Sequence, residues 1–146
     1  MIRIYLDNCC FNRPFDDQSS IRVKLETDAK LYIQLMIRTG KLELAWSYII
    51  DFENNANPFN ERKNTIDNWR NIAVADVEEN ESVFSKAMQC VNAGLKPKDA
   101  LHIACAIEAG CSYFLTTDDF ILKRMDSQNN IAVLNPIDFA KQIEEK

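Results

Sequence analysis

The sequence is poor in residues that bind soft metals or form a disulfide framework. It contains one histidine, and its five cysteines include no Cys-x-x-Cys pair, so a structural zinc site is not expected. The number of cysteines is odd and most of their neighbours are apolar. We therefore predict reduced thiols in or near the core, as in a reducing compartment: Cys9, Cys10, Cys90, Cys105 and Cys111.

Long apolar runs are also absent. No stretch approaches the ~20 apolar residues that cross a membrane, and the first residues lack the roughly 7–15-residue apolar run of a secretory signal. There is no internal repeat, low-complexity tract or linker. These absences predict one domain over residues 1–146, a cytoplasmic location and no membrane association.

The composition is that of a folded protein with a modest acidic excess. Apolar residues make up 47% and charged residues 27% of the chain. The net charge of −5 argues at first against a nucleic-acid partner. If four carboxylates gather in one site, however, 18 of the 22 acidic residues remain against 17 basic ones. The excess then belongs to the site, and a local nucleic-acid surface stays possible.

Short apolar runs alternate with longer helical patterns, which predicts an α/β fold with a mainly parallel sheet. The expected strands cover residues 2–6, 42–46, 72–75, 113–116 and 131–134. The expected helices cover about 20–39, 47–56, 58–70, 83–91, 98–109 and 119–125, with a last one opened by Asn135-Pro136. Residues 8–19, with Asn12-Arg13-Pro14 and Asp16-Asp17, are expected to form a polar loop.

Two aspartates come directly after predicted strands. Asp7 follows the first strand, and Asp118 comes just after the strand 113–116. Because ligands bind outside the carboxyl ends of parallel strands, both acids are expected at the same edge of the sheet. The alternatives are a loop turn for Asp7 and a helix N-cap for Asp118.

Another candidate acid lies on a strongly apolar helix. Asp99 stands in the first turn of the helix 98–109, where the helix dipole alone would favour it. The apolar residues of that helix predict that much of it is buried. An acid on such a helix is expected to have a specific partner.

The helix 47–56 carries two acids, Asp51 and Glu53, on opposing faces. Glu53 shares its face with apolar residues, which are Ile49, Ile50 and Ala56. The neighbours of Asp51 are mostly polar. We therefore predict that Glu53 faces the sheet edge and that Asp51 is solvated.

Four segments, in this order, resemble the motifs of the PIN-domain family of nucleases. Ile4-Tyr5-Leu6-Asp7-Asn8 looks like its opening strand and first acid, and Ser47 six residues before Glu53 is similar to its Ser-x5-Glu helix. Asp99-Ala100-Leu101-His102-Ile103-Ala104 resembles the third motif, and Leu115-Thr116-Thr117-Asp118 the fourth. Asn135-Pro136 before a last helix matches the usual ending. The resemblance covers nearly the whole chain.

This resemblance implies a three-layer α/β/α fold with a twisted, mainly parallel sheet. It also implies a Mg²⁺- or Mn²⁺-dependent endoribonuclease, most often the VapC-type toxin of a toxin–antitoxin pair. Asp7, Glu53, Asp99 and Asp118 would be its catalytic, metal-coordinating acids, holding one or two ions through the oxygen ligands that such cations prefer. The implied partners are an RNA substrate, a small antitoxin protein and a second copy of the chain in a homodimer.

Several residues near the acids are candidates for supporting roles. Thr116 is included with the catalytic residues because its hydroxyl could orient a ligand or a water; an ordinary strand residue is the alternative. His102 is expected to be a core histidine, with a hydrogen bond to the acid cluster as the alternative. Asp118 is followed by a second acid, Asp119, which leaves open which of the two caps a helix and which is a metal ligand. Candidate nucleic-acid contacts, against turn-forming or merely solvated side chains, are Asn8, Asn12, Arg13, Arg22 and Lys24.

Other classes of α/β protein also place acids at the ends of strands. A phosphotransfer receiver needs paired acids beside the first strand and a lysine after the last, where Asn8-Cys9 and Asn135-Pro136 stand instead. A haloacid-type phosphatase needs Asp-x-Asp, and Cys9 occupies its second position. Two alternatives remain within the PIN fold. One is an inactive binding or scaffold module, against which four intact acids argue. The other is a nuclease outside toxin–antitoxin systems, since residues 8–22 differ from the common toxin pattern.

Overall fold

Five parallel strands form a single sheet in the computed structural model, which describes residues 1–125 and 130–144. The strand order is β3-β2-β1-β4-β5. The strands are β1 (Arg3–Leu6), β2 (Glu43–Ser47), β3 (Ala75–Val77), β4 (Tyr113–Leu115) and β5 (Ala132–Leu134). The order reverses between β1 and β4, and parallel sheets bind ligands outside the strand ends at such a reversal.

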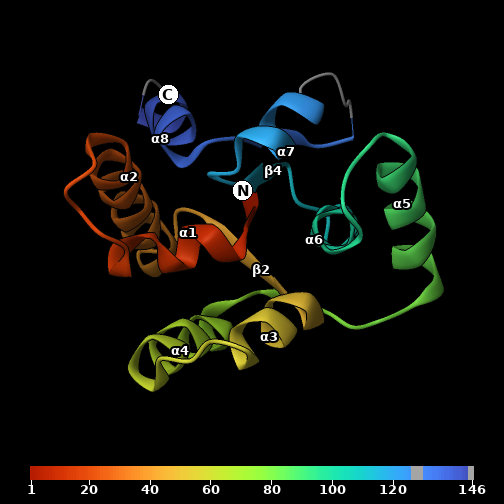
Figure 1. The fold of residues 1–146 in the computed structure, drawn as a ribbon, viewed down its shortest axis with the longest axis horizontal. Coiled ribbons are helices and arrows are strands. Elements are labelled where there is room, and N and C mark those ends of the chain that lie inside the picture. Colours follow the sequence, from red (N-terminus) through yellow and green to blue (C-terminus); the bar gives the residue numbers. More distant parts are fainter. Residues whose placement is uncertain (126–129, 145–146) are drawn as a thin grey trace.

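Helices flank this sheet on both sides. They are α1 (Asn8–Asn12), α2 (Ile21–Arg38), α3 (Tyr48–Asn55), α4 (Asn60–Asp67), α5 (Glu81–Asn92), α6 (Pro97–Glu108), α7 (Asp119–Arg124) and α8 (Pro136–Glu144), with short 3₁₀ turns η1 (Arg13–Phe15) and η2 (Asn68–Ile72). Figure 1 shows α2 beside α8 on one flank and α5 beside α6 on the other. The predicted α/β class with a parallel sheet is confirmed. In the described part of the chain, no helix is long and apolar enough to cross a membrane.

Local side chains define where the main helices begin and end. The side chains of Ser20, Ser47 and Asn80 each accept a backbone N–H from the first turn of α2, α3 and α5. Gly94 follows α5 with a φ of +109° and Gly110 follows α6 with a φ of +76°, conformations that favour glycine. These signals are why the boundaries of these helices lie close to those predicted.

The central strands β1, β2 and β4 are buried beyond their first residue, because helices cover both faces of the sheet. Ile4, Tyr5 and Leu6 of β1 are all inaccessible to solvent, and the ring of Tyr5 stacks on Phe114 of β4 at 5.4 Å. All five cysteines are free, as predicted; Cys9 is half-buried and the other four are buried. The core therefore holds β1 rigidly, and the residues that follow β1 start from a fixed point.

Two predicted segments are wrong in detail. The loop expected after the first strand is helical, forming α1 and η1, because Asp7 caps Asn8 and Pro14 suits the first turn of η1. The third strand lies at Ala75–Val77 instead of 72–75, because η2 extends the preceding helix to Ile72.

The helix α2 is present as predicted. Ile33 and Ile37 are buried in its second half, but in its first half apolar residues do not decide which face is buried. Glu26, Thr27 and Lys30 are buried, whereas Ile21 and Leu25 are exposed. Buried charges need partners, so this face of α2 must be stabilised by groups from elsewhere in the chain.

Candidate metal centre

The carboxyl ends of β1 and β4 place Asp7 and the segment around Asp118 side by side. Leu6 pairs with Leu115 across the two strands, and the backbone N–H of Asp7 donates to the Leu115 carbonyl at 2.9 Å. The next residues along each strand therefore leave the sheet at the same edge. This edge is the strand-order reversal at which a ligand site is expected.

Asp7 is buried and held in a fixed orientation. Its Oδ2 accepts a 2.8 Å hydrogen bond from the hydroxyl of Thr116, and its Oδ1 accepts one from the backbone N–H of Asn8, also at 2.8 Å. The Thr116 oxygen in turn accepts from the backbone N–H of Asp118 at 3.1 Å. Thr116 therefore holds the Asp7 carboxylate in place, and it directly follows β4 instead of ending that strand as predicted.

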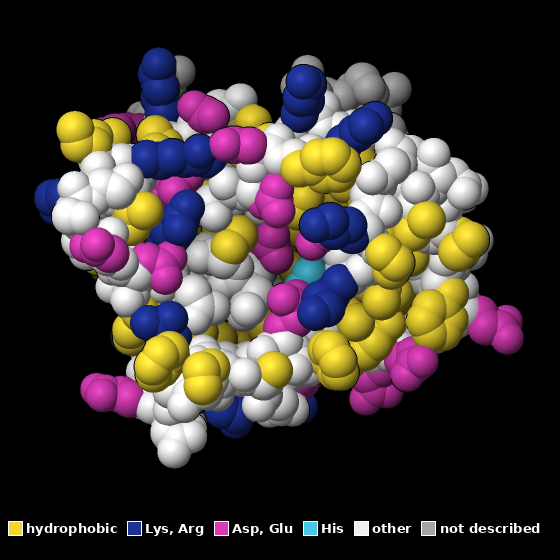
Figure 2. Space-filling model, in the orientation of Figure 1, with side chains coloured by type: hydrophobic (Ala, Val, Ile, Leu, Met, Phe, Trp, Pro, Cys, Tyr) yellow, Lys and Arg dark blue, Asp and Glu magenta, His cyan; other side chains and the backbone are white. Residues whose placement is uncertain are grey.

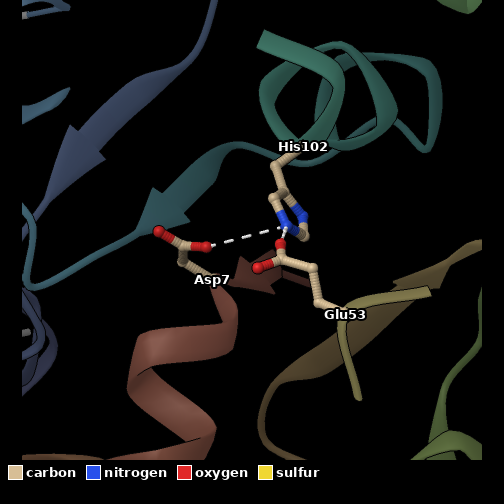
Figure 3. Close-up of side chains that lie close together, drawn as sticks. All are labelled: Asp7, Glu53 and His102. Atoms are coloured by element: carbon tan, nitrogen blue, oxygen red, sulfur yellow. Dashed lines mark hydrogen bonds and ion pairs between the residues drawn. The ribbon is translucent and has the colours of Figure 1, made fainter. Parts of the chain in front are cut away.

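Glu53 reaches the same edge from α3 and meets His102 of α6. A Glu53 carboxylate oxygen contacts Nε2 of His102, and that nitrogen lies 3.9 Å from Oδ1 of Asp7. Asp7, Glu53 and His102 each offer one possible metal-ligand atom, and these atoms all lie within 4.8 Å of one another. Figure 3 shows the three side chains converging from β1, α3 and α6.

His102 is buried, as predicted for a core histidine. It also contacts Glu53, so the alternative prediction of a contact with the acids holds as well. Its Nδ1 lies 2.7 Å from the hydroxyl of Tyr5, which lies 2.6 Å from the hydroxyl of Ser47. Burial raises the pKa of Tyr5 well above its usual value, so this hydroxyl stays protonated. An ionised Glu53 can only accept, so Nε2 carries the proton of the contact. A buried chain of polar groups therefore positions Glu53.

Sequence reasoning did not include Tyr5 among the candidate residues. The available signal was a hydroxyl-bearing residue inside an otherwise apolar strand, between Ile4 and Leu6. A buried tyrosine usually finds a hydrogen-bond partner for its hydroxyl. No local pattern indicated that this partner is His102, which lies 97 residues further along the chain.

Asp99 and Asp118 lie in the neighbourhood of this group but outside its compact centre. Asp99 is half-buried, and its pKa is raised by burial and then by the negative charges of Asp7, Asp118 and Glu53. Asp118 is exposed and caps α7, with Oδ1 accepting from the N–H groups of the second and third helix residues. All four predicted acids therefore surround one edge of the sheet, and two of them form the compact group with histidine.

The neighbouring Asp119 has a different role from Asp118. Both of its carboxylate oxygens accept hydrogen bonds from the guanidinium of Arg22, each at 2.8 Å. This pairing lowers the pKa of Asp119 and raises that of Arg22. Asp118 is therefore the cap of α7, and Asp119 is an ion-pair partner that ties α7 to α2.

The expectation that Asp51 is solvated is wrong in part. Its side chain is 30% exposed, and its Oδ1 accepts a 2.9 Å hydrogen bond from the indole N–H of Trp46. Ala56, expected on the inward face of α3, is exposed. The inward face is formed by Ile49 and Ile50, because α3 ends immediately before Ala56.

The five candidate nucleic-acid residues have unequal surroundings. The guanidinium of Arg13 pairs with Asp16 and Glu26, that of Arg22 with Glu26 and Asp119, and Lys24 is exposed and pairs with Asp28. The amide of Asn12 donates to the Asn8 carbonyl at 2.9 Å. Asn8 lies next to Asp7, and its side-chain oxygen is buried with no hydrogen-bond partner among the described residues.

The donor set fits a divalent cation. In residues 1–125 and 130–144, no Lys or Arg nitrogen lies within 4.0 Å of a carboxylate oxygen of Asp7, Glu53, Asp99 or Asp118. Carboxylates so close together repel one another unless a cation or protons neutralise them. Oxygen ligands suit Mg²⁺ and Mn²⁺, whereas His102, whose Nε2 donates to Glu53, positions a carboxylate instead of binding the ion.

Comparison with known proteins shows the fold. No protein-family model and no curated protein matches the sequence. Among solved structures, the chain is similar to one in VapBC-1 from nontypeable Haemophilus influenzae, with a TM-score of 0.59 and 12% identity. It is also similar to one in VapBC2 from Rickettsia felis bound to a DNA fragment from their promoter, with a TM-score of 0.58 and 12% identity. Each alignment covers 92% of this chain and 98% of the other. The fold is PIN-like, as predicted.

Proposed function

We propose that the protein is a metal-dependent endoribonuclease. The observation that carries this proposal is the approach of four acids, from four separate segments, to one sheet edge. Among the described residues, no Lys or Arg nitrogen lies within 4.0 Å of their carboxylate oxygens. Asp7, Glu53, Asp99 and Asp118 would hold one or two Mg²⁺ or Mn²⁺ ions. A divalent ion bound there supplies Lewis-acid polarisation of a phosphate oxygen and a water of lowered pKa.

The chain's own residues supply the fixed geometry that such chemistry needs. Thr116 orients Asp7 through a direct hydrogen bond. Ser47, Tyr5 and His102 orient Glu53 through the buried polar chain. Glu53 and Asp99 are half-buried. Because solvent reaches them less than it reaches exposed acids, their attraction for a cation is stronger. These contacts explain why residues that do not bear carboxylates belong to the site.

A cleavage assay with paired variants tests the proposal. The wild type should cleave a mixed RNA preparation with Mg²⁺ or Mn²⁺ and lose this activity in EDTA. Glu53→Gln should abolish cleavage and weaken metal binding measured by calorimetry. Asp51→Asn, on the same helix but bonded to Trp46, should leave both within a few-fold. Cleavage that persists in EDTA, or an active Glu53→Gln variant, would remove the basis for a metal site here.

We further infer that this nuclease acts as the toxin of a toxin–antitoxin pair and forms a homodimer. The support is the family resemblance and the fold shared with the VapBC structures. In addition, α2 exposes apolar side chains of a kind that partner proteins cover: Ile21, Leu25, Leu31 and Leu35. Expression of the chain alone should arrest growth of the host cells. Coexpression of a small protein encoded by an adjacent gene should relieve the arrest. Harmless expression of an active, monomeric enzyme would instead favour a nuclease outside such pairs.

An inactive scaffold is the alternative function. It would bind RNA or a protein partner without cleaving RNA under any metal condition. The crowding of the four acids opposes this alternative, because repelling carboxylates cost stability unless they bind a cation. Calorimetric titration with Mn²⁺ distinguishes the two, since a scaffold has no need of a metal.

A further inference from the structure

An exposed aromatic ring and a lysine stand together beside the acids. Phe52 of α3 is 64% exposed, and its ring centre lies 5.8 Å from Nζ of Lys98, near the start of α6. Phe52 precedes Glu53 in the sequence, and Lys98 precedes Asp99. The contact between Glu53 and His102 joins α3 to α6 at this point. The Phe52–Lys98 pair is therefore fixed next to two of the four acids.

The interactions that stabilise the fold leave both members of this pair available. Most of the Phe52 side chain remains in contact with solvent. Lys98 is exposed, and among the described residues no carboxylate oxygen lies within 4.0 Å of its ammonium. A single exposed apolar residue is common and carries no inference. The combination of a mostly exposed ring with a lysine that has no carboxylate partner in the described residues, beside a proposed site for phosphodiesters, is more specific.

The surrounding surface has a matching distribution of charge. In Figure 2 acidic side chains gather at the centre of this face, with the histidine among them and Lys or Arg side chains on both sides. A second pair of the same type lies on α7, where the Arg124 guanidinium is 5.3 Å from the ring centre of Phe120, two residues after Asp118. Phe120 is 45% exposed. The acidic centre thus has aromatic and basic groups at its border.

We propose that Phe52 and Lys98 bind one unpaired nucleotide of the RNA next to the phosphate that is cleaved. The base stacks on the ring of Phe52, and the Lys98 ammonium contacts the adjoining backbone phosphate. Every base has a π-face, so stacking of this kind tolerates any sequence. This proposal rests on the proposed nuclease function and adds the two residues of this chain that hold a nucleotide beside the cut.

The chemistry of this pair favours an unpaired nucleotide over a paired one as its occupant. Bases inside an A-form helix are stacked on each other and offer no free face to Phe52, whereas those of loops and single strands do. The ammonium of Lys98 complements a phosphate, and the neighbouring acids repel acidic peptides as well as phosphates until a metal is bound. A bound metal lowers this repulsion at the point where the phosphodiester must enter.

Fluorescence anisotropy of labelled RNA tests the proposal separately from catalysis. A short single-stranded RNA and the same strand annealed to its complement are titrated with the full-length protein in Ca²⁺, which oxygen ligands bind, and a gel checks that the RNA stays intact. The variants are Phe52→Leu and Lys98→Ala. The control is Phe84→Leu, which removes an exposed phenylalanine from α5. Ser82 bonds to Glu108 at the far end of α6, so Phe84 lies away from Lys98.

The wild type should bind the single strand more tightly than the duplex. Phe52→Leu should weaken binding of the single strand about tenfold without changing its salt dependence, because stacking is lost and charge is retained. Lys98→Ala should reduce the slope of log K against log salt by about 0.7, the value for one phosphate contact of a single strand. Phe84→Leu should behave as the wild type.

Each contrary result has a definite meaning. Unchanged affinity and salt slope in both variants would overturn the assignment and leave this surface for a protein partner. Equal binding of single strand and duplex would overturn it as well. Should the wild type bind single-stranded RNA through both residues yet fail to cleave it with Mg²⁺ or Mn²⁺, the nuclease function would be refuted and the binding site would stand.

Discussion

Two groups of carboxylates in this molecule differ in how their charge is neutralised. At the edge of the sheet, Asp7 and Glu53 meet His102 and have no Lys or Arg within 4.0 Å in the described residues. On α2, Glu26 is completely buried, yet both of its oxygens are paired: one with Arg13 at 2.8 Å and the other with Arg22 at 3.2 Å.

The comparison separates a structural cluster from the proposed metal site. Glu26 also accepts from the amide of Asn135, and Arg22 continues to the Thr117 carbonyl at 2.9 Å and to Asp119. This network joins α2 to the segments before α7 and α8 and needs no further cation. The acids at the sheet edge lack such partners, and the missing positive charge is what a metal ion would provide.

The largest expected effect comes from neutralising one acid at the sheet edge. Asp7→Asn should abolish RNA cleavage, lowering kcat by at least about 10³-fold, because a ligand of the proposed metal is lost. Its melting temperature without metal should be unchanged or higher, since removing one carboxylate relieves repulsion. Activity assays and thermal unfolding in EDTA provide the measurements. Unfolding of this variant would show that Asp7 is needed as a cap for α1.

Neutralising Glu26, the buried acid that is paired with two arginines, should have the reverse outcome. Glu26→Gln leaves two guanidinium groups without their buried partner and should destabilise the fold by about 2–4 kcal/mol. Cleavage per folded molecule should change only a few-fold, because Glu26 is not among the proposed ligands. Urea unfolding and activity at low temperature test this. A stable but inactive Glu26→Gln variant would erase the distinction between the two groups.

A buried charge on the same face of α2 provides a third case. Lys30 is almost completely buried, and its ammonium lies 5.4 Å from the ring centre of Phe11 and 5.6 Å from that of Trp69. Burial lowers its pKa to about 8 from the usual 10.5. Below pH 8 both folded and unfolded chains are protonated, and the full cost of burying the charge is present. Above pH 8 the folded chain loses the proton first, and the cost falls until about pH 10.5.

Lys30→Met should therefore stabilise the protein at neutral pH and not at alkaline pH. The expected gain at pH 7 is about 1–3 kcal/mol, since the removed cost is offset in part by lost contacts with the rings. The difference from wild type should shrink toward pH 10. Unfolding of both proteins at the two pH values measures it, with the exposed Lys24→Met as a control. A gain that does not depend on pH would mean that packing, not charge, is responsible.

The smallest expected effect concerns the polar chain behind Glu53. Tyr5→Phe removes the hydroxyl between Ser47 and His102. Leaving these buried groups without that partner should cost about 1–2 kcal/mol of stability. Cleavage should fall several-fold, less than for Glu53→Gln, because the histidine orients its acid less tightly. A Tyr5→Phe enzyme with wild-type kcat would show that His102 is fixed by packing alone.

The sequence by itself determined the order of the elements and the place of the acids. Apolar alternation and helical period are local, and side chains such as Ser20 and Ser47 end or begin elements through contacts within a few residues. The carboxyl ends of parallel strands share one edge whatever the details of packing. That rule was enough to bring Asp7 and Asp118 together in the prediction.

Only the tertiary structure decided which polar groups became partners. In the first half of α2 the buried face could not be read from the apolar period, because Glu26 is stabilised in part by Asn135, 109 residues away. The adjacent Asp118 and Asp119 have different roles because Arg22, which lies 97 residues before Asp119, pairs with the Asp119 carboxylate. Hydrogen bonds and ion pairs depend on distance and direction between atoms of distant segments. Such geometry exists only once the helices have packed on the sheet.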